Sequence, residues 1–251
     1  MDFAYTAEQE KLREEVRGFI KANVTPELLH EADAEASTTP DRPRGMSPKA
    51  AALYKKIYDR GWLGITYPKE YGGQGGDRLT QYIVEEEFTR AGINISLGGS
   101  GAPAIMAAGT EEQKKYYIPG LIKREITFAL GFTEPHAGAD LANLRCSAVE
   151  DGDYYVINGQ KMYTSAAHFA THIYLMARTD RNAPKHEGIS IFLFPMDTPG
   201  ITVRPIRQII DDSDPARPRS TGAFLVGGPV ITINNHQIAA AGPKRCGCLP
   251  R

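Results

Sequence analysis

The feature that most constrains this fold is a change in hydrophobic period near residue 125. Before it, apolar residues recur every three or four positions behind helix-capping pairs such as Thr6 with Gln9 and Thr110 with Gln113. From Ile126 onward, short β-rich runs alternate with turn signals at regular spacing, which favours an antiparallel sheet or barrel over βαβ units. The sequence therefore predicts an α+β fold, with an N-terminal all-helical domain followed by a small antiparallel β-barrel or β-sheet domain.

Helix boundaries in the first domain follow from capping and stop signals. The run Glu85-Glu86-Glu87 could offer a general base, but three successive helical positions point in three directions and do not converge on one site. A solvated face is therefore expected. The expected helices begin after Thr6, run from Ser47 and Pro48 to Gly61, cover Thr80 to Ala91, and extend from Thr110 to a break at Pro119-Gly120.

The second domain is predicted from runs of β-branched and aromatic residues between turns. Asp151-Gly152 and Asn158-Gly159 are typical of hairpin turns. The expected strands are Ile126 to Phe132, Tyr154 to Ile157, His172 to Met176, Ile189 to Phe194 and Ile201 to Ile206. The helical domain is therefore expected at residues 1–124 and the β domain at 125–208.

Residues 209–251 form a divergent tail rich in glycine and proline. Val230 to Ile233 reads as a strand and Asn234-Asn235 as a turn, but no hydrophobic period is sustained. We therefore expect an irregular, poorly structured C-terminal tail.

Charge and composition exclude several classes of protein. With 29 Lys+Arg against 30 Asp+Glu, the chain lacks the basic excess that nucleic-acid binding requires, so no nucleic-acid partner is expected. No apolar run approaches the roughly 20 residues of a membrane span, and the acidic N-terminus shows no targeting segment. The three cysteines exclude a disulfide framework and fit a reducing compartment. We therefore expect a soluble, cytoplasmic protein.

One glycine-rich stretch matches two catalytic motifs only weakly. Gly99 to Ala104 satisfies the dinucleotide-binding fingerprint, but Gly109-Thr110 breaks the helix that should follow it. The same stretch is one residue short of the nucleophile elbow of hydrolases. Neither a nicotinamide site nor a hydrolase site is therefore favoured.

Two further motifs are better explained without a function, one as a plain turn and one as a chance grouping of residues. Gly72 to Gly76 could approach a phosphate, but such loops between helices are more often plain turns. Cys246 and Cys248 with His236 lack a fourth ligand and the usual spacing of a zinc site. No metal site is predicted.

Two turn segments carry most of the chemical information. The strand that ends at Thr133 turns through Pro135 and Gly138, which exposes backbone N–H groups and one hydroxyl. This arrangement suits the polar edge of a heteroaromatic ring or a phosphate. Later in the chain, Tyr163 is followed by two hydroxyls, so a planar ring could stack there while Ser165 donates to its edge. The residues alone leave two ordinary hairpin turns as the alternative.

At these residues the chain resembles the FAD-dependent acyl-CoA dehydrogenases, over the range from about Tyr5 to Arg207. Several motifs in the family's order carry the resemblance. They are Gly61-Trp-Leu-Gly, Pro68-Lys-Glu-Tyr-Gly-Gly73, Gly109-Thr-Glu-Glu-Gln-Lys114, Thr133-Glu-Pro-x-Ala-Gly138, Asn158-Gly-x-Lys161, Ala177-Arg-Thr179 and Asp197-Thr-Pro-Gly-Ile201. The resemblance implies a helical domain followed by a β domain, in agreement with the change of period, and FAD as the cofactor.

The resemblance also implies a flavin site. Thr133 would hydrogen-bond the pyrimidine side of the isoalloxazine, Tyr163 would pack on the flavin, and Ser165 would lie beside N5, the atom that accepts hydride. Ala139 stands where many members have serine, and His136 where glycine is commoner. The expected cofactor-binding residues are Leu130, Phe132, Thr133, Gly138, Ala139, Tyr163, Thr164 and Ser165.

The implied activity is α,β-dehydrogenation of an acyl-CoA thioester in fatty acid or lipid catabolism, with hydride transfer to FAD and an electron-transfer flavoprotein or similar acceptor. In this family a C-terminal helical domain carries the catalytic glutamate and most oligomer contacts, whereas this chain has no glutamate beyond Glu187. We therefore expect a truncated and impaired oxidoreductase, in a homo- or hetero-oligomer, with no catalytic residue assigned. The alternative is a non-catalytic remnant or scaffold that binds flavin or acyl-CoA.

Overall fold

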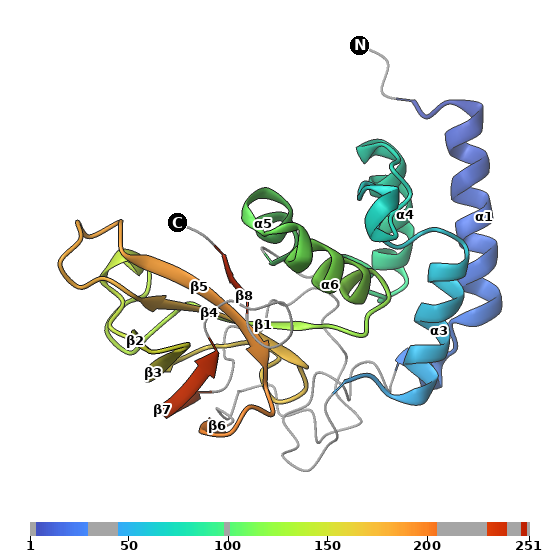
Figure 1. Ribbon diagram of the computed structural model, residues 1–251. Coiled ribbons are helices and arrows are strands. Elements are labelled where there is room, and N and C mark those ends of the chain that lie inside the picture. The colour runs from blue at the N-terminus through green and yellow to red at the C-terminus, as the bar shows by residue number, and fades with distance from the viewer. Residues whose placement is uncertain (1–3, 30–44, 98–100, 205–229, 240–246, 250–251) are drawn as a thin grey trace. The chain divides into compact units, whose positions relative to one another are not determined.

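The computed structural model describes residues 4–29, 45–97, 101–204, 230–239 and 247–249 (Figure 1). The chain divides into two compact units. The first comprises Met1–Ser37, Met46–Ala102 and Lys115–Glu125, and the second comprises Thr38–Gly45, Pro103–Lys114 and Ile126–Arg251. The segment Pro103–Lys114 thus groups with the strands, although it lies within the helical part of the sequence.

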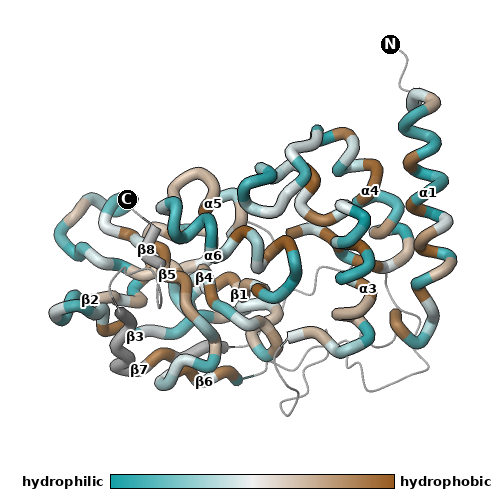
Figure 2. Tube along the Cα trace, turned by 45° about the vertical axis from the view of Figure 1, so that its right-hand side comes forward, coloured by the Kyte–Doolittle hydropathy of each residue, from teal (hydrophilic) through white to brown (hydrophobic). Residues whose placement is uncertain are grey.

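The capping residues predicted from the sequence begin several helices. Thr6 and Gln9 bond reciprocally at the start of α1 (Ala7–Asn23), and Ser47 caps α3 (Pro48–Asp59). Figure 2 shows hydrophilic and hydrophobic positions alternating around these two helices, as expected when one side is buried. Among the described residues, no helix is long and apolar enough to cross a membrane. The other helical elements are η1 (Lys69–Tyr71), α4 (Arg78–Arg90), α5 (Gly101–Ala108), α6 (Glu111–Ile122) and residues 26–29.

Helix α6 is longer than predicted. The expected break at Pro119-Gly120 is wrong, because the helix continues through Pro119 to Ile122. A proline inside a helix removes one backbone donor and disfavours the preceding turn. Here the residues around it, Ile118 and Leu121, are buried in the core, and their packing holds the helical path.

Three aromatic rings form the centre of the first unit. Phe19 on α1, Trp62 after α3 and Phe88 on α4 pack edge-to-face, with ring centroids 5.2 to 6.1 Å apart. Each ring comes from a different element, so their contact joins α1, α4 and the segment after α3 into one core.

Glu87 differs from the prediction of a solvated face. Its side chain is only 4% exposed, and its carboxylate accepts hydrogen bonds from Arg17 and Arg13 of α1 at 2.8 and 3.0 Å. The hydrogen bond from Arg17, together with that from Arg13, holds the pKa of Glu87 below its usual range. Successive helical positions do diverge, and Glu87 occupies the one that faces α1.

The glycine-rich loop after η1 is a structural turn, as the sequence favoured. All of its main-chain donors are bound within the protein, so none is free for a phosphate. The N–H groups of Gly72, Gly73, Gln74, Gly75 and Gly76 donate to the carbonyls of Lys69, Pro68, Gly64, Tyr67 and Ile65. The chain also passes too close for side chains, since a Cβ at Gly73 would lie 2.2 Å from the Tyr67 carbonyl oxygen.

We expect Gly73→Ala to lower the free energy of unfolding by about 1–3 kcal/mol, because the added methyl group forces the loop away from Tyr67. Gly18→Ala is the matched control: a Cβ there meets nothing within 4 Å, and alanine should stabilise α1 by about 0.5–1 kcal/mol. Denaturant titrations followed through the fluorescence of the single tryptophan, Trp62, report on this unit. Equal effects of the two substitutions would contradict the packing argument.

In the described residues of the second unit, an eight-stranded sheet has the order β6-β7-β3-β2-β4-β5-β8, and β1 pairs with β4 outside this path. It is a mixed and open sheet, since β1 runs parallel to β4 and the order ends at two different strands. The prediction of a β domain is confirmed, but the purely antiparallel and barrel forms are not. The strands are β1 (Phe128–Gly131), β2 (Ser147–Asp151), β3 (Tyr154–Lys161), β4 (His172–Arg178), β5 (Ile189–Pro195), β6 (Ile201–Arg204), β7 (Val230–Ala239) and β8 (Gly247–Leu249).

Asn158-Gly159 is not a turn, contrary to prediction. Both residues lie within β3, where the register with β7 shifts between Ile157 and Gly159. A Cβ at Gly159 would lie 2.5 Å from Cys146 Sγ, so glycine is required for the close approach of Cys146, which precedes β2. A glycine in a strand thus marks a backbone contact here rather than a hairpin.

The expected strand at Val230–Ile233 is confirmed as the start of β7, whereas the expected turn at Asn234-Asn235 and the irregular chain at β8 are wrong. β7 continues through Asn234-Asn235 to Ala239 and pairs antiparallel with β3, while β8 pairs with β5. Both strands add to sheet neighbours far away in the sequence, so the tail's own weak hydrophobic period does not indicate them. Ile233 of β7 is buried in the core of this unit, which also contains Ile157, Ile173 and Phe192.

Candidate functional site

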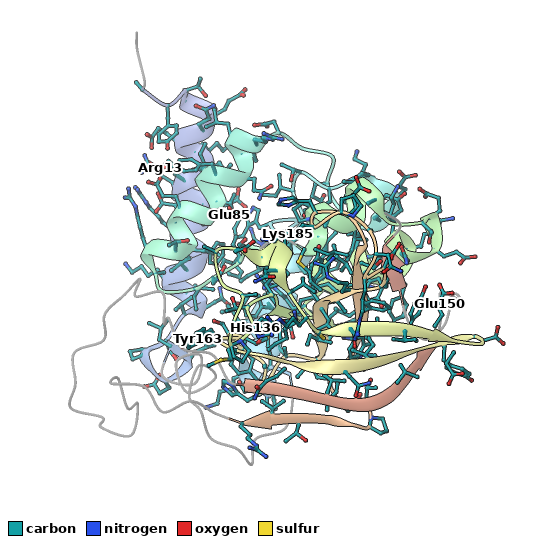
Figure 3. The ribbon with its side chains drawn as sticks, turned by 90° about the vertical axis from the view of Figure 1, so that its left-hand side faces the viewer. Arg13, Glu85, His136, Glu150, Tyr163 and Lys185 are labelled. Atoms are coloured by element: carbon teal, nitrogen blue, oxygen red, sulfur yellow. The ribbon has the colours of Figure 1, made fainter. Side chains whose placement is uncertain are left out.

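The two turn segments singled out from the sequence lie side by side. The backbone N–H of Met162, just after β3, donates to the carbonyl of Thr133, just after β1, at 2.8 Å. Lys161, the last residue of β3, donates from Nζ to the carbonyl of Phe132 at 3.1 Å. Figure 3 shows the labelled His136 and Tyr163 at the same end of the strands. The ends of β1 and β3 therefore form one candidate site.

Glu134 and Lys161 make a buried ion pair beneath this site. Their side chains are 1% and 0% exposed, and Lys161 Nζ donates to Glu134 Oε1 at 2.8 Å. The backbone N–H groups of Arg145 and Cys146 donate to the same carboxylate at 2.6 and 2.9 Å. Glu134 also closes its own turn, by paired backbone hydrogen bonds with Ala137. The carboxylate therefore fixes the loop that follows β1 to the start of β2 and the end of β3.

Lys161 lies in the motif Asn158-Gly-x-Lys161, but the sequence predicted no role for it. Its position in the strand could have indicated a role. Lys161 ends β3 at a position that faces the protein interior, and a buried lysine requires a partner. Glu134 is the only acidic residue of the loop that lies before Asp140, so the partner could have been sought there.

The hydrogen bonds to Glu134 favour its charged form. Burial raises the pKa of Glu134, but the hydrogen bonds from Lys161 and from the backbone of Arg145 and Cys146 outweigh it and leave the pKa below its usual range. Nearby, burial raises the pKa of the Cys146 thiol to about 11, so this free cysteine stays protonated and unreactive. His136 Nε2 lies 3.2 Å from Glu134 Oε2 on the outer side of the loop.

The predicted cofactor-binding residues on β1 and its end are half-buried. Leu130 pairs in register with Tyr174 of β4, and the ring of Phe132 packs edge-to-face on Tyr174 with centroids 5.5 Å apart. Thr133 follows directly. Gly138 and Ala139 are exposed farther along the loop, and among the described residues no backbone hydrogen bond joins them to the segment after β3.

The predicted residues after β3 form a tight, unusual turn. Tyr163 has a positive φ of 55° and a side chain that is 50% exposed, although aromatic residues rarely adopt this conformation. Ser165 is exposed, whereas Thr164 is fully buried. The Thr164 hydroxyl has no hydrogen-bond partner among the described residues, and it lies within the protein rather than on the surface of the site.

These residues fit a planar, polar cofactor. Within the described chain, the hydroxyls of Thr133 and Ser165 make no hydrogen bond to protein, so both are available to a ligand. Tyr163 offers an exposed ring beside them, and a Cβ built at Gly138 meets nothing within 4 Å, so the loop leaves open space. An aromatic surface with a few polar groups is typical of sites that bind a heteroaromatic ring.

The other motifs give no competing site. No strand occurs among residues 93–97, and α5 ends at Ala108, so the dinucleotide fingerprint lacks its structural context. No group of His, Cys, Asp or Glu that could hold a metal occurs in the described ranges. Cys246 and the side chains of His236 and Cys248 lie outside what the structure describes.

Two protein-family models match the chain. The model of the acyl-CoA dehydrogenase N-terminal domain matches residues 6–125, and that of the acyl-CoA dehydrogenase middle domain matches residues 129–211. The acyl-CoA dehydrogenase FadE26 of Mycobacterium tuberculosis is 35% identical over 99% of this chain and 65% of its own length.

Two solved structures are similar over nearly the whole chain. The Tcur3481-Tcur3483 steroid ACAD superposes with a TM-score of 0.76 and 33% identity, covering 98% of this chain and 58% of that one. The ChsE4-ChsE5 complex from Mycobacterium tuberculosis gives a TM-score of 0.77 and 32% identity over the same shares. The chain thus spans less than two thirds of the length of each of these proteins.

We expect Glu134→Gln to lower the free energy of unfolding near neutral pH by about 3–5 kcal/mol, because it leaves Lys161 as an uncompensated buried charge. The folded-state pKa of Glu134 is depressed, so its stabilisation is present above the unfolded-state value of about 4.3 and is lost as pH falls through the folded-state value. The difference between wild type and variant should therefore narrow toward acid pH in denaturant titrations.

Lys185→Met is the matched control, because Lys185 and Asp140 form a pair at 2.7 Å whose side chains are 51% and 57% exposed. Its loss should cost at most about 1 kcal/mol. A difference between wild type and Glu134→Gln that stayed constant over the whole pH range would contradict the depressed pKa.

Proposed function

Because the chain belongs to the acyl-CoA dehydrogenase family, we propose that it binds FAD and acts in the α,β-dehydrogenation of an acyl-CoA thioester. The observation that carries the proposal is the hydrogen bond between Met162 and Thr133, which brings the two predicted flavin-binding segments into one site. We also propose that residues 1–124 and 125–208 act as the helical and β domains, with 209–251 as a third region.

Members of this family bind FAD, and the residues at the ends of β1 and β3 are suited to hold it. Thr133 would donate to the pyrimidine side of the ring system, with the backbone near Leu130 and Phe132 beside it. Tyr163 would stack on the ring, and Ser165 would donate to the edge near N5. When bound, FAD supplies the hydride acceptor of the reaction.

Glu134 directly follows Thr133 in this site, but we propose that it does not serve as the base that removes the α-proton. Its carboxylate is buried and already accepts hydrogen bonds from Lys161, Arg145 and Cys146. A general base must reach the substrate proton and have a pKa tuned toward the working pH, whereas this pKa is depressed. We propose that the base comes from another part of the protein or from a partner subunit.

The partners of this chain are proposed from its relatives. Both solved structures reported above carry the names of two proteins, so we propose that this chain works in an assembly of two kinds of subunit or of its own copies. A steroid-type acyl-CoA is the proposed substrate class, since one of these relatives is a steroid ACAD. An electron-transfer flavoprotein or similar acceptor would take the electrons, and a cytoplasmic location fits the free, buried Cys146.

We expect the purified protein to retain FAD more tightly than NAD or NADP in equilibrium dialysis, because the site offers a stacking ring and two free hydroxyls. Thr133→Val and Ser165→Ala should each weaken FAD binding by roughly 3- to 10-fold, the loss of one hydrogen bond. Thr89→Val, on an exposed position of α4, is the control. Equal retention of flavin and nicotinamide nucleotides would overturn the cofactor assignment.

We expect anaerobic addition of a saturated acyl-CoA thioester to bleach the visible band of bound FAD, because dehydrogenation transfers two electrons to the flavin. Short-chain, long-chain and steroid-type thioesters should differ in rate, and free CoA should have no effect. Thioester binding without bleaching by any of them would instead support a binding protein without dehydrogenase activity.

A further inference from the structure

The peptide planes after β1 have defined directions. The peptide between Thr133 and Glu134 is held on both sides, since its carbonyl accepts from Met162 at 2.8 Å and its N–H donates to Ala137 at 2.9 Å. The described peptides contain no cis bond, and in a trans peptide the C=O and N–H groups point in opposite directions. Met162 and Ala137 therefore lie on opposite sides of this peptide.

The preceding peptide, between Phe132 and Thr133, is held on one side only. Its carbonyl accepts from Lys161 Nζ at 3.1 Å. The N–H of Thr133 must then point away from Lys161, by the same trans geometry. No acceptor for this N–H occurs among the residues that the structure describes. The N–H of this peptide is thus a main-chain donor without a partner in the described chain, next to a peptide that is held on both sides.

We propose that Lys161 is a positioning residue for the cofactor: its bond to the Phe132 carbonyl presets the Thr133 N–H as a donor to an acceptor atom on the pyrimidine edge of FAD. This inference rests on the proposed FAD site. Lys161 is fully buried, so it does not touch the cofactor itself. Its charge is balanced by Glu134, so it acts on the cofactor through the orientation of the peptide.

The paired charges explain why a lysine can do this inside the protein. A buried ammonium needs a counter-charge and partners for its N–H groups. Glu134 provides the counter-charge at 2.8 Å, and the Phe132 carbonyl takes a second N–H. The same side chain therefore holds the loop after β1 and the direction of its first peptide.

The first test uses the wild-type protein with and without FAD. We expect the Thr133 amide hydrogen to exchange slowly with solvent deuterium only when FAD is bound, by at least tenfold relative to the free protein, because a bound acceptor covers it. The amide of Glu134, already bonded to Ala137, should change much less. FAD binding without protection of Thr133 would overturn this inference while leaving the proposed function intact, whereas no FAD binding would overturn both.

The second test compares two double variants that lack both buried charges. Lys161→Met with Glu134→Gln removes the donor to Phe132, whereas Lys161→Gln with Glu134→Gln keeps an N–H donor at position 161. We expect the methionine pair to bind FAD about tenfold more weakly and to shift the infrared carbonyl bands of bound FAD to higher wavenumber. The glutamine pair should lie closer to wild type in both measurements.

Circular dichroism and unfolding midpoints establish that both double variants are folded. A methionine pair that binds FAD with wild-type affinity and unshifted carbonyl bands would overturn the role of Lys161. So would equal losses in the two pairs, because these would report the missing charges alone. Lys185→Met, at the exposed pair with Asp140, should leave affinity and spectrum unchanged.

Discussion

The buried ion pair between Lys161 and Glu134 is the interaction on which the candidate site depends. Removing two charges from water costs several kcal/mol for each ion, and the cost is met only when nearly every donor and acceptor has a partner. Here the carboxylate accepts from Lys161, Arg145 and Cys146, and the ammonium also binds the Phe132 carbonyl. The pair therefore joins the ends of β1 and β3 to the start of β2, which hydrophobic contacts alone would not position in one register.

Around this pair, β3 and the residue that precedes β2 approach each other closely. Gly159 lies two residues before Lys161 and leaves room for Cys146, whose N–H bonds Glu134. A larger residue at position 159 would push β3 away from Cys146 and so strain the same carboxylate from its other side. The register shift at Gly159 and the ion pair therefore depend on each other. The close approach of the backbone provides the hydrogen bonds that a buried charge needs.

Features set by neighbouring residues could be predicted from the sequence, whereas contacts between segments far apart in the chain could not. Capping pairs such as Thr6 with Gln9 placed helix starts well, because these signals lie within one turn of the chain. The break predicted at Pro119 failed because buried neighbours override a local penalty. The segments at Thr133 and Tyr163 were singled out from their residue types. Their contacts, from Met162 to Thr133 and from Lys161 to Phe132, could not be predicted, because a lone lysine in a strand does not indicate its partner. Strand β7 was missed beyond Ile233 because its order comes from β3, far away in the sequence.

The pairing of β3 with β7 also sets an order of events during synthesis. Lys161 lies opposite Ile231 in this ladder, so a strand of the candidate site is completed by residues made much later. A ribosome adds roughly 5–20 residues per second, so β3 has an unpaired edge for several seconds while the intervening chain emerges. An open strand edge is a template for pairing with other chains. The site-bearing strand is therefore most exposed to misassociation before β7 arrives, and chaperone demand should concentrate in that interval of translation.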